Sequence, residues 1–437
     1  MTQVTPGRAA AYAVRVETER GRRLDRAFAD VAGSLEPRER AFAHELAWGV
    51  TRLRGRLDSL IAPHVSRPLT EVDALVLELL RLGAYQIFYM DSVPTYAAVS
   101  ATVDQVRAEL GRRPTGFANA VLRKVAGVRP MPPESLESVD ALSEWGSHPT
   151  WLVRRWLSRY GGNDVRRLIE HNNRRPPTCL LPLGMCGDEA QRILVEHGIG
   201  ATPAAEWSPC LKLTEGTSVA AALKALPASI VQDPASNLVA RYADVSSGTI
   251  VADLCAAPGG KSLALSDRAA RILAADRSEP RIRMVRDNAL RTGRRLDLVV
   301  ADAVCPPLMR VDAVLLDAPC TGTGTLARHP DARWRLRPTA IDEMAAVQEQ
   351  MLDAAAHVVR PGGLLIYSTC TLEPEENEER VADFLERHPG FVLEPTDAVA
   401  RRDAGEDGFV DDEGYLRVEP WRSGYDGSFA ARLRKAA

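Results

Sequence analysis

TIVADLCAAPGGKS, residues 249–262, is the stretch that decides the fold of this 437-residue chain. An apolar run of strand length leads into a loop of small residues and then into the start of a helix. Ala256, Ala257, Gly259 and Gly260 would let the backbone approach a ligand closely, and amides at the helix start could hold a carboxylate. The loop is not a GxGxxG motif, and the sequence has no GxxxxGK(S/T) phosphate loop, which disfavours a nucleoside triphosphatase.

Four further apolar runs of strand length follow this stretch. Helical segments separate several of them, which predicts βαβ units and a largely parallel α/β sheet. The runs are ARILAADR (270–277), LDLVVADA (296–303), VDAVLLDAP (311–319) and GGLLIYSTC (362–370).

Aspartate stands at or near the end of four of the five runs, as Asp253, Asp276, Asp302 and Asp317. One such residue is often a turn or cap, but ligands of open α/β sheets bind at the edge where these carboxyl ends meet. Asp276 stands where an acid binds ribose hydroxyls, and Asp302 where an acid would meet an adenine edge. S-adenosylmethionine, with its carboxylate, ribose and adenine, is therefore the predicted cofactor.

Two of the runs lead into a cysteine, Cys320 in one and Cys370 in the other. C5 of a pyrimidine is a poor nucleophile until a thiolate adds to C6, which creates an enamine that can attack a methyl group. Two thiols beside a methyl donor therefore predict covalent catalysis at pyrimidine C5. Asp317 could favour the addition by hydrogen bonding the N3/N4 edge of a cytosine.

The other cysteines are expected to serve as small buried hydrophobic residues. The chain has seven cysteines in all, an odd number, and no CxxC pair occurs. Both facts argue against a disulfide framework and a zinc site, so we expect free thiols and no metal. The residues concerned are Cys179, Cys186, Cys210, Cys305 and, with its backbone near the cofactor, Cys255.

Residues 8–127 have apolar side chains at three- and four-residue spacing, which predicts helices. Residues 1–127 carry a net charge of +4 and the remainder −7, which hints at a polyanionic partner. No apolar run has membrane-spanning length and the N-terminus has no signal core, so a cytoplasmic protein is expected. The predicted organisation is an all-α domain at 1–130, a linker at 131–150, a small α/β module at 151–240 and the ligand-binding α/β domain at 241–437.

Four motifs together resemble those of the Sun/Fmu-type RNA cytosine-5 methyltransferases. They are DLCAAPGGK (253–261), DAPCTGTG (317–324), HPDARW (329–334) and YSTCTLEPEEN (367–377). The helical region is similar to the NusB-like RNA-binding domain in front of the RsmB branch, most clearly in GFANAVLRKV (116–125). The resemblance covers nearly the whole chain. It implies NusB-like helices, a small RRM-like α/β module and a Rossmann-like methyltransferase domain dependent on S-adenosylmethionine.

The resemblance also implies roles for single residues. The family's nucleophile matches Cys370, and the cysteine that assists product release matches Cys320. A purely local interpretation would have chosen Cys320, because DNA cytosine-5 methyltransferases use a Pro-Cys thiol as nucleophile. Asp317 is expected to be the third catalytic residue. Cofactor binding is expected for Cys255, Ala256, Ala257, Pro258, Gly259, Gly260, Lys261, Asp276, Asp302 and Asp317.

Three more segments carry expectations. VQDPASN (231–237) should pack near the site, and Glu375 and Glu376 should cap the following helix. A basic segment could grip phosphate and stack a base, although a solvated basic loop explains it almost as well. Its residues are Arg328, His329, Arg333, Trp334 and Arg335.

These patterns favour an rRNA cytosine-5 methyltransferase, acting as a monomer on an unstacked base of small-subunit rRNA. Three alternatives remain: the same chemistry on tRNA, a DNA methyltransferase, and an RNA-binding or antitermination factor with a vestigial catalytic domain. The NusB-like front domain disfavours tRNA only by analogy. The second thiol and the RNA-module front end count against DNA, and the paired cysteines and four acids count against a vestigial site.

Overall fold

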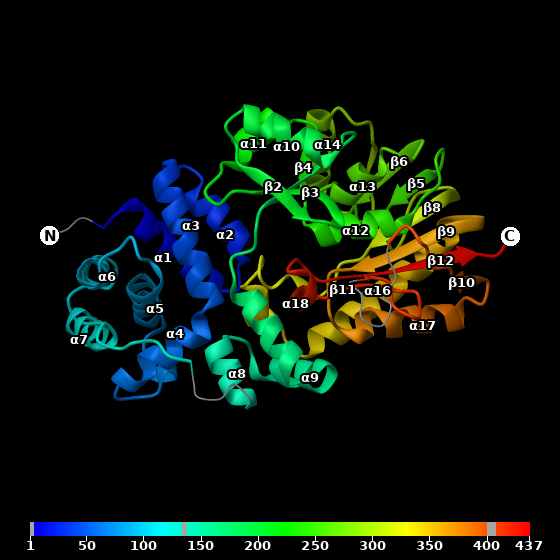
Figure 1. Ribbon diagram of the computed structural model, residues 1–437. Coiled ribbons are helices and arrows are strands. Elements are labelled where there is room, and N and C mark those ends of the chain that lie inside the picture. Colours follow the sequence, from blue (N-terminus) through cyan, green and yellow to red (C-terminus); the bar gives the residue numbers. More distant parts are fainter. Residues whose placement is uncertain (1–3, 133–137, 400–407) are drawn as a thin grey trace. The chain divides into compact units, whose positions relative to one another are not determined.

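The computed structural model describes residues 4–132, 138–399 and 408–437, and the chain forms two compact units. The first comprises Met1–Arg175 with Leu326–Leu336, and the second comprises Pro176–Thr325 with Arg337–Ala437. The first unit is helical, and the second combines sheets with helices (Figure 1). Within the described residues, no helix is long and apolar enough to cross a membrane.

Helix α5 (Ala74–Tyr89) is the centre of the first unit. It is apolar on most of its circumference, and residues 76–86 are all buried, as expected of a helix surrounded by others. It begins at Asp73, whose carboxylate caps the amides of Leu75 and Val76. The helices packed on it are α1 (Pro6–Glu19), α3 (Pro37–Arg52), α4 (Arg54–Ile61), α6 (Thr95–Leu110) and α7 (Thr115–Val125), while α2 (Leu24–Ala32) packs on α1 and α3. The predicted all-α fold of this region is confirmed.

Two further helices complete the first unit together with the short α15 (Ala332–Arg335). Helix α8 (Val139–Gly146) packs on α4, and α9 (Thr150–Asn173) packs on α8 and bends at Gly161, where φ is 76°. Helix α9 therefore belongs to the helical first unit, although its residues were predicted to begin the small α/β module. The domain boundaries at 130, 150 and 240 stay predictions.

The second unit begins with a small four-stranded antiparallel sheet of order β2-β3-β1-β4. Leu180 and Leu211 pack under its two helices, while Cys179 and Leu181 point the other way, toward Leu263. The chain order is a βαββαβ arrangement, so the predicted small α/β module is confirmed. Its elements are β1 (Cys179–Pro182), α10 (Gly187–Glu196), β2 (Ala201–Ala205), β3 (Ser208–Leu213), α11 (Val219–Ala225) and β4 (Ser229–Val231).

The large sheet of the second unit has the order β10-β12-β9-β8-β5-β6-β7. Strands β5 to β9 are mutually parallel, which confirms the predicted α/β sheet, and β12 runs antiparallel to β9. Its strands are β5 (Ile250–Asp253), β6 (Arg271–Asp276), β7 (Asp297–Val300), β8 (Val311–Asp317), β9 (Val359–Thr369), β10 (Phe391–Leu393) and β12 (Ser428–Lys435), with β11 (Leu416–Val418) paired to β12.

Helices cover both faces of this sheet, as Figure 1 shows. Along β8, Val314 and Leu316 join a core with α16 (Thr339–Val358) and α17 (Glu378–Arg387), whereas Ala313 and Leu315 join the core under α12 (Pro234–Ala243) and α13 (Gly260–Leu265). Helix α14 (Glu279–Thr292) packs on β6 and β7. Burial on both faces explains why these strands are almost continuously apolar in sequence.

The strand order reverses at β5, because β6 lies on one side of it and β8 on the other. Connections leave β5 and β8 toward opposite sides at such a switch point, which opens a crevice beyond the carboxyl ends of the strands. The residues that follow β5, β6, β8 and β9 are therefore the candidates for the functional site.

Candidate active site

The predicted aspartates lie at the carboxyl edge of the large sheet. Asp253, Asp276 and Asp317 are the last residues of β5, β6 and β8. Asp302 lies just beyond β7, is exposed, and accepts a hydrogen bond from the amide of Val304 at 3.1 Å. The predicted position at strand ends is therefore confirmed, while contact of each acid with a cofactor stays a prediction.

Asp253 is buried and shapes the loop that follows it. Its carboxylate accepts hydrogen bonds from the Ser262 hydroxyl at 2.6 Å and from the Cys255 amide at 3.3 Å. Burial raises the pKa of Asp253 to about 7, because the charged form is poorly solvated there. Asp253 thus ties the end of β5 to the first turn of α13.

The small-residue loop is as tight as its sequence suggests. Gly259 has a φ of 104°, a conformation that favours glycine, and a Cβ at Gly260 would lie 2.8 Å from Nε2 of Gln232. Gln232 belongs to the 231–237 segment, which therefore packs near the site as predicted. Its Oε1 is buried without a hydrogen-bond partner in the described parts of the chain. The backbone of the loop therefore lies close to Gln232, whose Oε1 is an acceptor without a partner among the described residues.

Asp276 is held in place by groups from α14 and the turn before it. It accepts a hydrogen bond from the Ser278 amide at 3.0 Å and pairs with Arg281 at 3.4 Å. Arg281 also donates to the carbonyl of Ala257 at 2.7 Å. This arginine, which the sequence alone did not single out, joins the end of β6 to the loop after β5.

Asp317 forms the centre of a polar group with Lys261 and Ser368. Lys261 Nζ lies 2.7 Å from Oδ2 of Asp317, and the Ser368 hydroxyl donates to Oδ1 at 2.8 Å. Burial acts to lower the pKa of Lys261, but the Asp317 carboxylate outweighs it and the pKa is raised. Ser368 was missed from the sequence, although it lies opposite Asp317 in the β8–β9 register.

The two predicted catalytic thiols meet at this edge. Cys320 Sγ and Cys370 Sγ lie 3.3 Å apart, well beyond the S–S bond length of about 2.05 Å, and both are free. The amide of Cys370 also donates to Cys320 Sγ at 3.4 Å. The hydrogen bond to Cys370, and then burial, raise the pKa of Cys320 well above its ordinary value.

Backbone contacts hold the two thiol loops together. The Gly324 amide donates to the carbonyl of Cys370 at 3.0 Å, and the Gly427 amide donates to the carbonyl of Gly324 at 2.7 Å. A Cβ at Gly324 would lie 2.8 Å from the Cys370 carbonyl and 2.9 Å from Cα of Gly427. Only glycine permits this approach, so the turn before β12 packs directly on the Cys320 loop.

Glu376 corrects one prediction about this region. It was expected to cap α17, but its carboxylate instead accepts hydrogen bonds from the amide and hydroxyl of Thr321 and from Gln348. Helix α17 begins after Asn377 with no side-chain cap. Glu376 therefore supports the Cys320 loop.

The remaining cysteines divide by exposure. Cys179 and Cys210 are buried, as predicted, and Cys255 is half-buried at the loop after β5. Cys186 and Cys305 are exposed, so their prediction as buried hydrophobic residues was wrong. Both lie outside strands, in a turn before α10 and in the segment after β7, where no core reaches them. The described residues contain no His, Cys, Asp and Glu cluster suited to a metal ion.

Arg333 is a structural residue of the first unit rather than an RNA ligand. Its side chain is fully buried and donates to backbone carbonyls of Arg52, Ser147, Asn172 and Leu326 and to the side chain of Asn173. Burial lowers its pKa well below the ordinary value. The predicted phosphate contact is therefore wrong for this residue.

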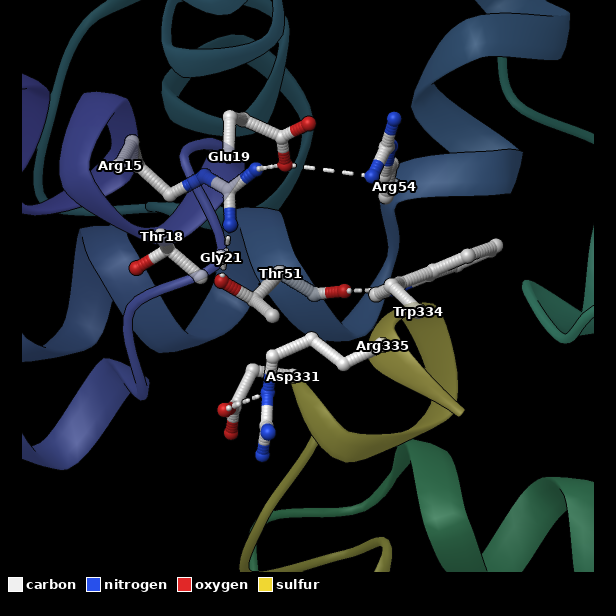
Figure 2. Close-up of a pocket in the computed structure, with 9 residues that line it drawn as sticks. All are labelled: Arg15, Thr18, Glu19, Gly21, Thr51, Arg54, Asp331, Trp334 and Arg335. Atoms are coloured by element: carbon white, nitrogen blue, oxygen red, sulfur yellow. Dashed lines mark hydrogen bonds and ion pairs between the residues drawn. The ribbon is translucent and has the colours of Figure 1, made fainter. Parts of the chain in front are cut away.

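Trp334 and Arg335 line a cavity of about 380 Å³ in the same unit. Figure 2 shows that its charged groups are largely paired: Arg335 with Asp331, and both Arg15 and Arg54 with Glu19. Trp334 donates Nε1 to the Thr51 carbonyl at 2.8 Å, and Arg54 lies over its ring. These pairs leave little unsatisfied charge for a phosphate. The lining residues are Arg15, Thr18, Glu19, Gly21, Thr51, Arg54, Asp331, Trp334 and Arg335.

Comparison with known proteins assigns each region to a family. Residues 242–434 match the family model described as 16S rRNA methyltransferase RsmB/F. Ribosomal RNA small subunit methyltransferase B of Salmonella typhi is 32% identical over 98% of this chain and 97% of its own length. The chain belongs to the RsmB/F family. Residues 8–127 match the NusB family, and 148–220 match the ferredoxin-like domain of RsmF/B-like methyltransferases.

Solved structures agree with the RsmB/F assignment. The crystal structure of PH0851 matches with a TM-score of 0.78 and 27% identity, over 99% of both chains. A methyltransferase homolog protein from Pyrococcus horikoshii matches with a TM-score of 0.57 and 27% identity, over 69% of this chain and 99% of its own.

RsmB/F proteins are S-adenosylmethionine-dependent RNA methyltransferases, and the residues at the sheet edge fit this cofactor. A Cβ at Gly260 would lie 2.8 Å from Nε2 of Gln232, so the loop at 255–261 packs closely on the 231–237 segment. Gln232 Oε1 is a buried acceptor without a partner among described residues, and Asp276 ends the strand next to β5. Such groups suit the polar parts of a nucleoside with an amino-acid tail.

Proposed function

We propose that this chain transfers a methyl group to C5 of a cytosine in small-subunit rRNA. The observation that carries the proposal is the pair of thiols 3.3 Å apart at the carboxyl edge, beside the Asp317–Lys261 pair. S-adenosylmethionine, when bound, supplies the electrophilic methyl group. The rest of the chemistry falls to the chain's own residues.

Cys370 is the proposed nucleophile. Its match to the nucleophile of the family that the chain resembles supports this role, and the thiolate is the form that attacks. The Cys320 sulfur lies 3.3 Å away, and either thiol could be the donor in this contact. Cys320 is therefore proposed as the partner that stays in contact with the attacking sulfur.

The reaction then proceeds through a covalent adduct with the base. The Cys370 thiolate forms an S–C6 bond, and the C5–C6 electron pair becomes available at C5 to accept the methyl group. A base removes the C5 proton, the electron pair re-forms the C5–C6 double bond, and the S–C6 bond breaks to return the thiolate. Cys320 lies within contact of the leaving sulfur, where it can assist this last step.

Asp317 is proposed to orient the base. Its carboxylate, which is paired with Lys261, would accept a hydrogen bond from the exocyclic amine of cytosine. The Ser368 hydroxyl fixes the second carboxylate oxygen. A uracil, with a carbonyl in place of that amine, would face the carboxylate unfavourably, which gives a physical reason for cytosine.

Cofactor binding is proposed for the residues implied by the family resemblance. The loop from Cys255 to Lys261 would lie against the amino-acid part, and Asp276 and Asp302 would meet the ribose and the adenine. Asp317 would border the methyl group as well as the base. The proposed domains are those at 1–130, 151–240 and 241–437, with the helical domain supplying affinity for rRNA and the chain acting as a monomer.

Covalent trapping tests the proposal. Wild type, Cys320→Ala and Cys370→Ala would be incubated with tritiated S-adenosylmethionine and either small-subunit rRNA or tRNA, and then run on denaturing gels. We expect Cys320→Ala to accumulate a protein–rRNA adduct and Cys370→Ala to give neither adduct nor methylation. Cys186→Ala, which removes an exposed thiol of the small α/β module, is the matched control and should behave as wild type.

Two results would contradict the proposal. Methylation by Cys370→Ala would make the Pro-Cys thiol the nucleophile. Labelling of tRNA in preference to rRNA would mean that the enzyme carries out the same reaction on a different RNA substrate. Nuclease digestion of the labelled RNA identifies the product, which should be 5-methylcytidine.

A further inference from the structure

The carboxylate of Glu376 and the amide of Gln348 hold the two residues that flank Cys320. Glu376 Oε2 accepts a hydrogen bond from the Thr321 amide at 2.9 Å, and Oε1 accepts one from the Thr321 hydroxyl. Gln348 Nε2 donates to the Pro319 carbonyl and to Glu376 Oε2, both at 2.9 Å. One connected pair of side chains therefore fixes the backbone on both sides of the thiol.

Both side chains are fully buried and come from elements outside the thiol loop. Gln348 lies on α16, and Glu376 lies in the turn that precedes α17. Among the described residues, the groups that donate to Glu376 are amides and hydroxyls of Thr321, Gln348 and Thr371 rather than cations, and burial raises the pKa of Glu376. A buried carboxyl without a cationic partner is costly, so its use at this position calls for a specific reason.

The same contacts extend to the second thiol. The Thr321 hydroxyl lies 2.9 Å from the hydroxyl of Thr371, which directly follows Cys370. The Thr371 hydroxyl lies 3.0 Å from that of Thr323. Movement of Thr321 would therefore change the 3.3 Å separation of the two sulfurs.

We propose that Glu376, together with Gln348, is a positioning residue for the release thiol. It acts through Thr321 and Pro319 and holds Cys320 against the sulfur of Cys370. This inference rests on the proposed function and deepens it, because Glu376 touches neither reacting thiol. Loss of Glu376 should slow the step that needs Cys320 and spare the attack by Cys370.

Glu376→Gln is the first test, since an amide of the same shape cannot accept from all of the groups that donate to Glu376. Single-turnover labelling with tritiated S-adenosylmethionine and small-subunit rRNA measures methyl transfer, and denaturing gels measure the trapped adduct. We expect methyl transfer within about threefold of wild type and resolution of the adduct slowed about tenfold, as for a misplaced group. The variant should therefore trap adduct, as Cys320→Ala does.

Thr321→Val is a milder second variant, in case Glu376→Gln fails to fold. It removes the hydroxyl donor and keeps the shape, whereas Thr321→Ser keeps the hydroxyl and should restore wild-type resolution. Glu349→Gln is the matched control. It lies next to Gln348 on α16, is 41% exposed, and pairs with Arg380 rather than with the thiol loop.

The outcomes distinguish a failure of the positioning role of Glu376 from a failure of the release step by Cys320. Adduct accumulation by Glu376→Gln and Thr321→Val, with rescue by Thr321→Ser, supports the inference. Wild-type resolution in Glu376→Gln and Thr321→Val overturns it, as does an equal fall of attack and resolution, which would mean a merely structural role. If Cys320→Ala itself traps nothing, the proposed release step fails; if it traps and the other variants do not, only this inference fails.

Discussion

Two polar segments almost adjacent in sequence, 317–324 and 329–334, use their side chains in opposite ways. The first brings Asp317 and Cys320 to the edge of a sheet, where both remain only half-buried. The second buries Arg333 completely and gives its guanidinium to backbone carbonyls. Charged and nucleophilic residues therefore indicate a functional site only where their polar atoms can still bind a ligand and are not fully bonded to the protein. Variants in the two segments should accordingly separate activity from stability.

Asp317→Asn should give the largest effect in the first segment. The amide would face Lys261 and could no longer hold the cytosine amine as a carboxylate does, so methyl transfer should fall by about 10³-fold. The free energy of unfolding of the second unit should fall by about 1–3 kcal/mol, because the largely buried Lys261 ammonium would lose its charged partner. Single-turnover labelling and calorimetry measure the two quantities.

Asp312→Asn is the control for that prediction. Asp312 lies near the start of the same strand and pairs with Arg360. It should retain wild-type labelling. A loss of less than about tenfold in Asp317→Asn would fall outside the range of acid–base and orienting groups and would contradict the assigned role.

Arg333→Met should show the opposite pattern. Buried carbonyl oxygens of the first unit would lose their donor, and unfolding should become easier by about 3 kcal/mol. Binding of S-adenosylmethionine should be unchanged, since Arg333 contacts only the first unit. Denaturant unfolding and isothermal titration measure these effects, and Arg333→Lys should rescue little because an ammonium group lacks the planar fork. Unchanged stability would contradict the structural role.

Asp253→Asn should alter how stability depends on pH. The folded-state pKa of about 7 exceeds the ordinary value of 3.8, so the folded state binds the proton more tightly. The unfolding free energy of wild type therefore falls as pH rises, by about 2 kcal/mol between pH 5 and 7 from this group. The asparagine variant should lack this contribution, and its melting temperature should fall less over that range. Parallel curves for the two proteins would contradict the prediction.

Arg335→Ala should give the smallest effect. Arg335 is on the same short helix as Arg333, but it is half-exposed and already paired with Asp331. Its loss should cost less than about 1 kcal/mol in stability. The slope of log Kd for rRNA against log salt should also stay unchanged, whereas a phosphate contact would reduce it by about one. A reduced slope would return this residue to the RNA interface.

The parts of the site that follow from local pattern could be predicted from the sequence. The acids at strand ends and the two thiols each directly follow an apolar run, and parallel strands bring such ends together. The role of Arg333 could not be predicted, because its acceptors at Arg52 and Ser147 lie more than a hundred residues away in sequence. The role of Glu376 was wrongly predicted for a related reason. An acid before a helix has the pattern of a helix cap, and its actual partners, Thr321 and Gln348, are distant in sequence.

Other site residues could not be predicted because their roles depend on contacts with another strand or helix. Ser368 and Gln348 are ordinary polar residues in sequence, and contact with Asp317 and Pro319 gives them a place in the site. Cys186 and Cys305 resembled core residues by type, but turns and loops expose them. The pairing of Asp317 with Ser368 depends on the β8–β9 register, because β9 extends one residue further, to Thr369.

The contact between Gly324 and Gly427 has a consequence for biosynthesis. Strand β12 lies between β9 and β10, and the turn before it packs on the Cys320 loop. A ribosome adds residue 427 about 57 codons after Cys370, so the nascent chain carries both thiols for some time without this contact. The helices at 8–127 are made earlier and can fold before that interval begins. The thiol site can therefore be completed only after the turn before β12 has been synthesised.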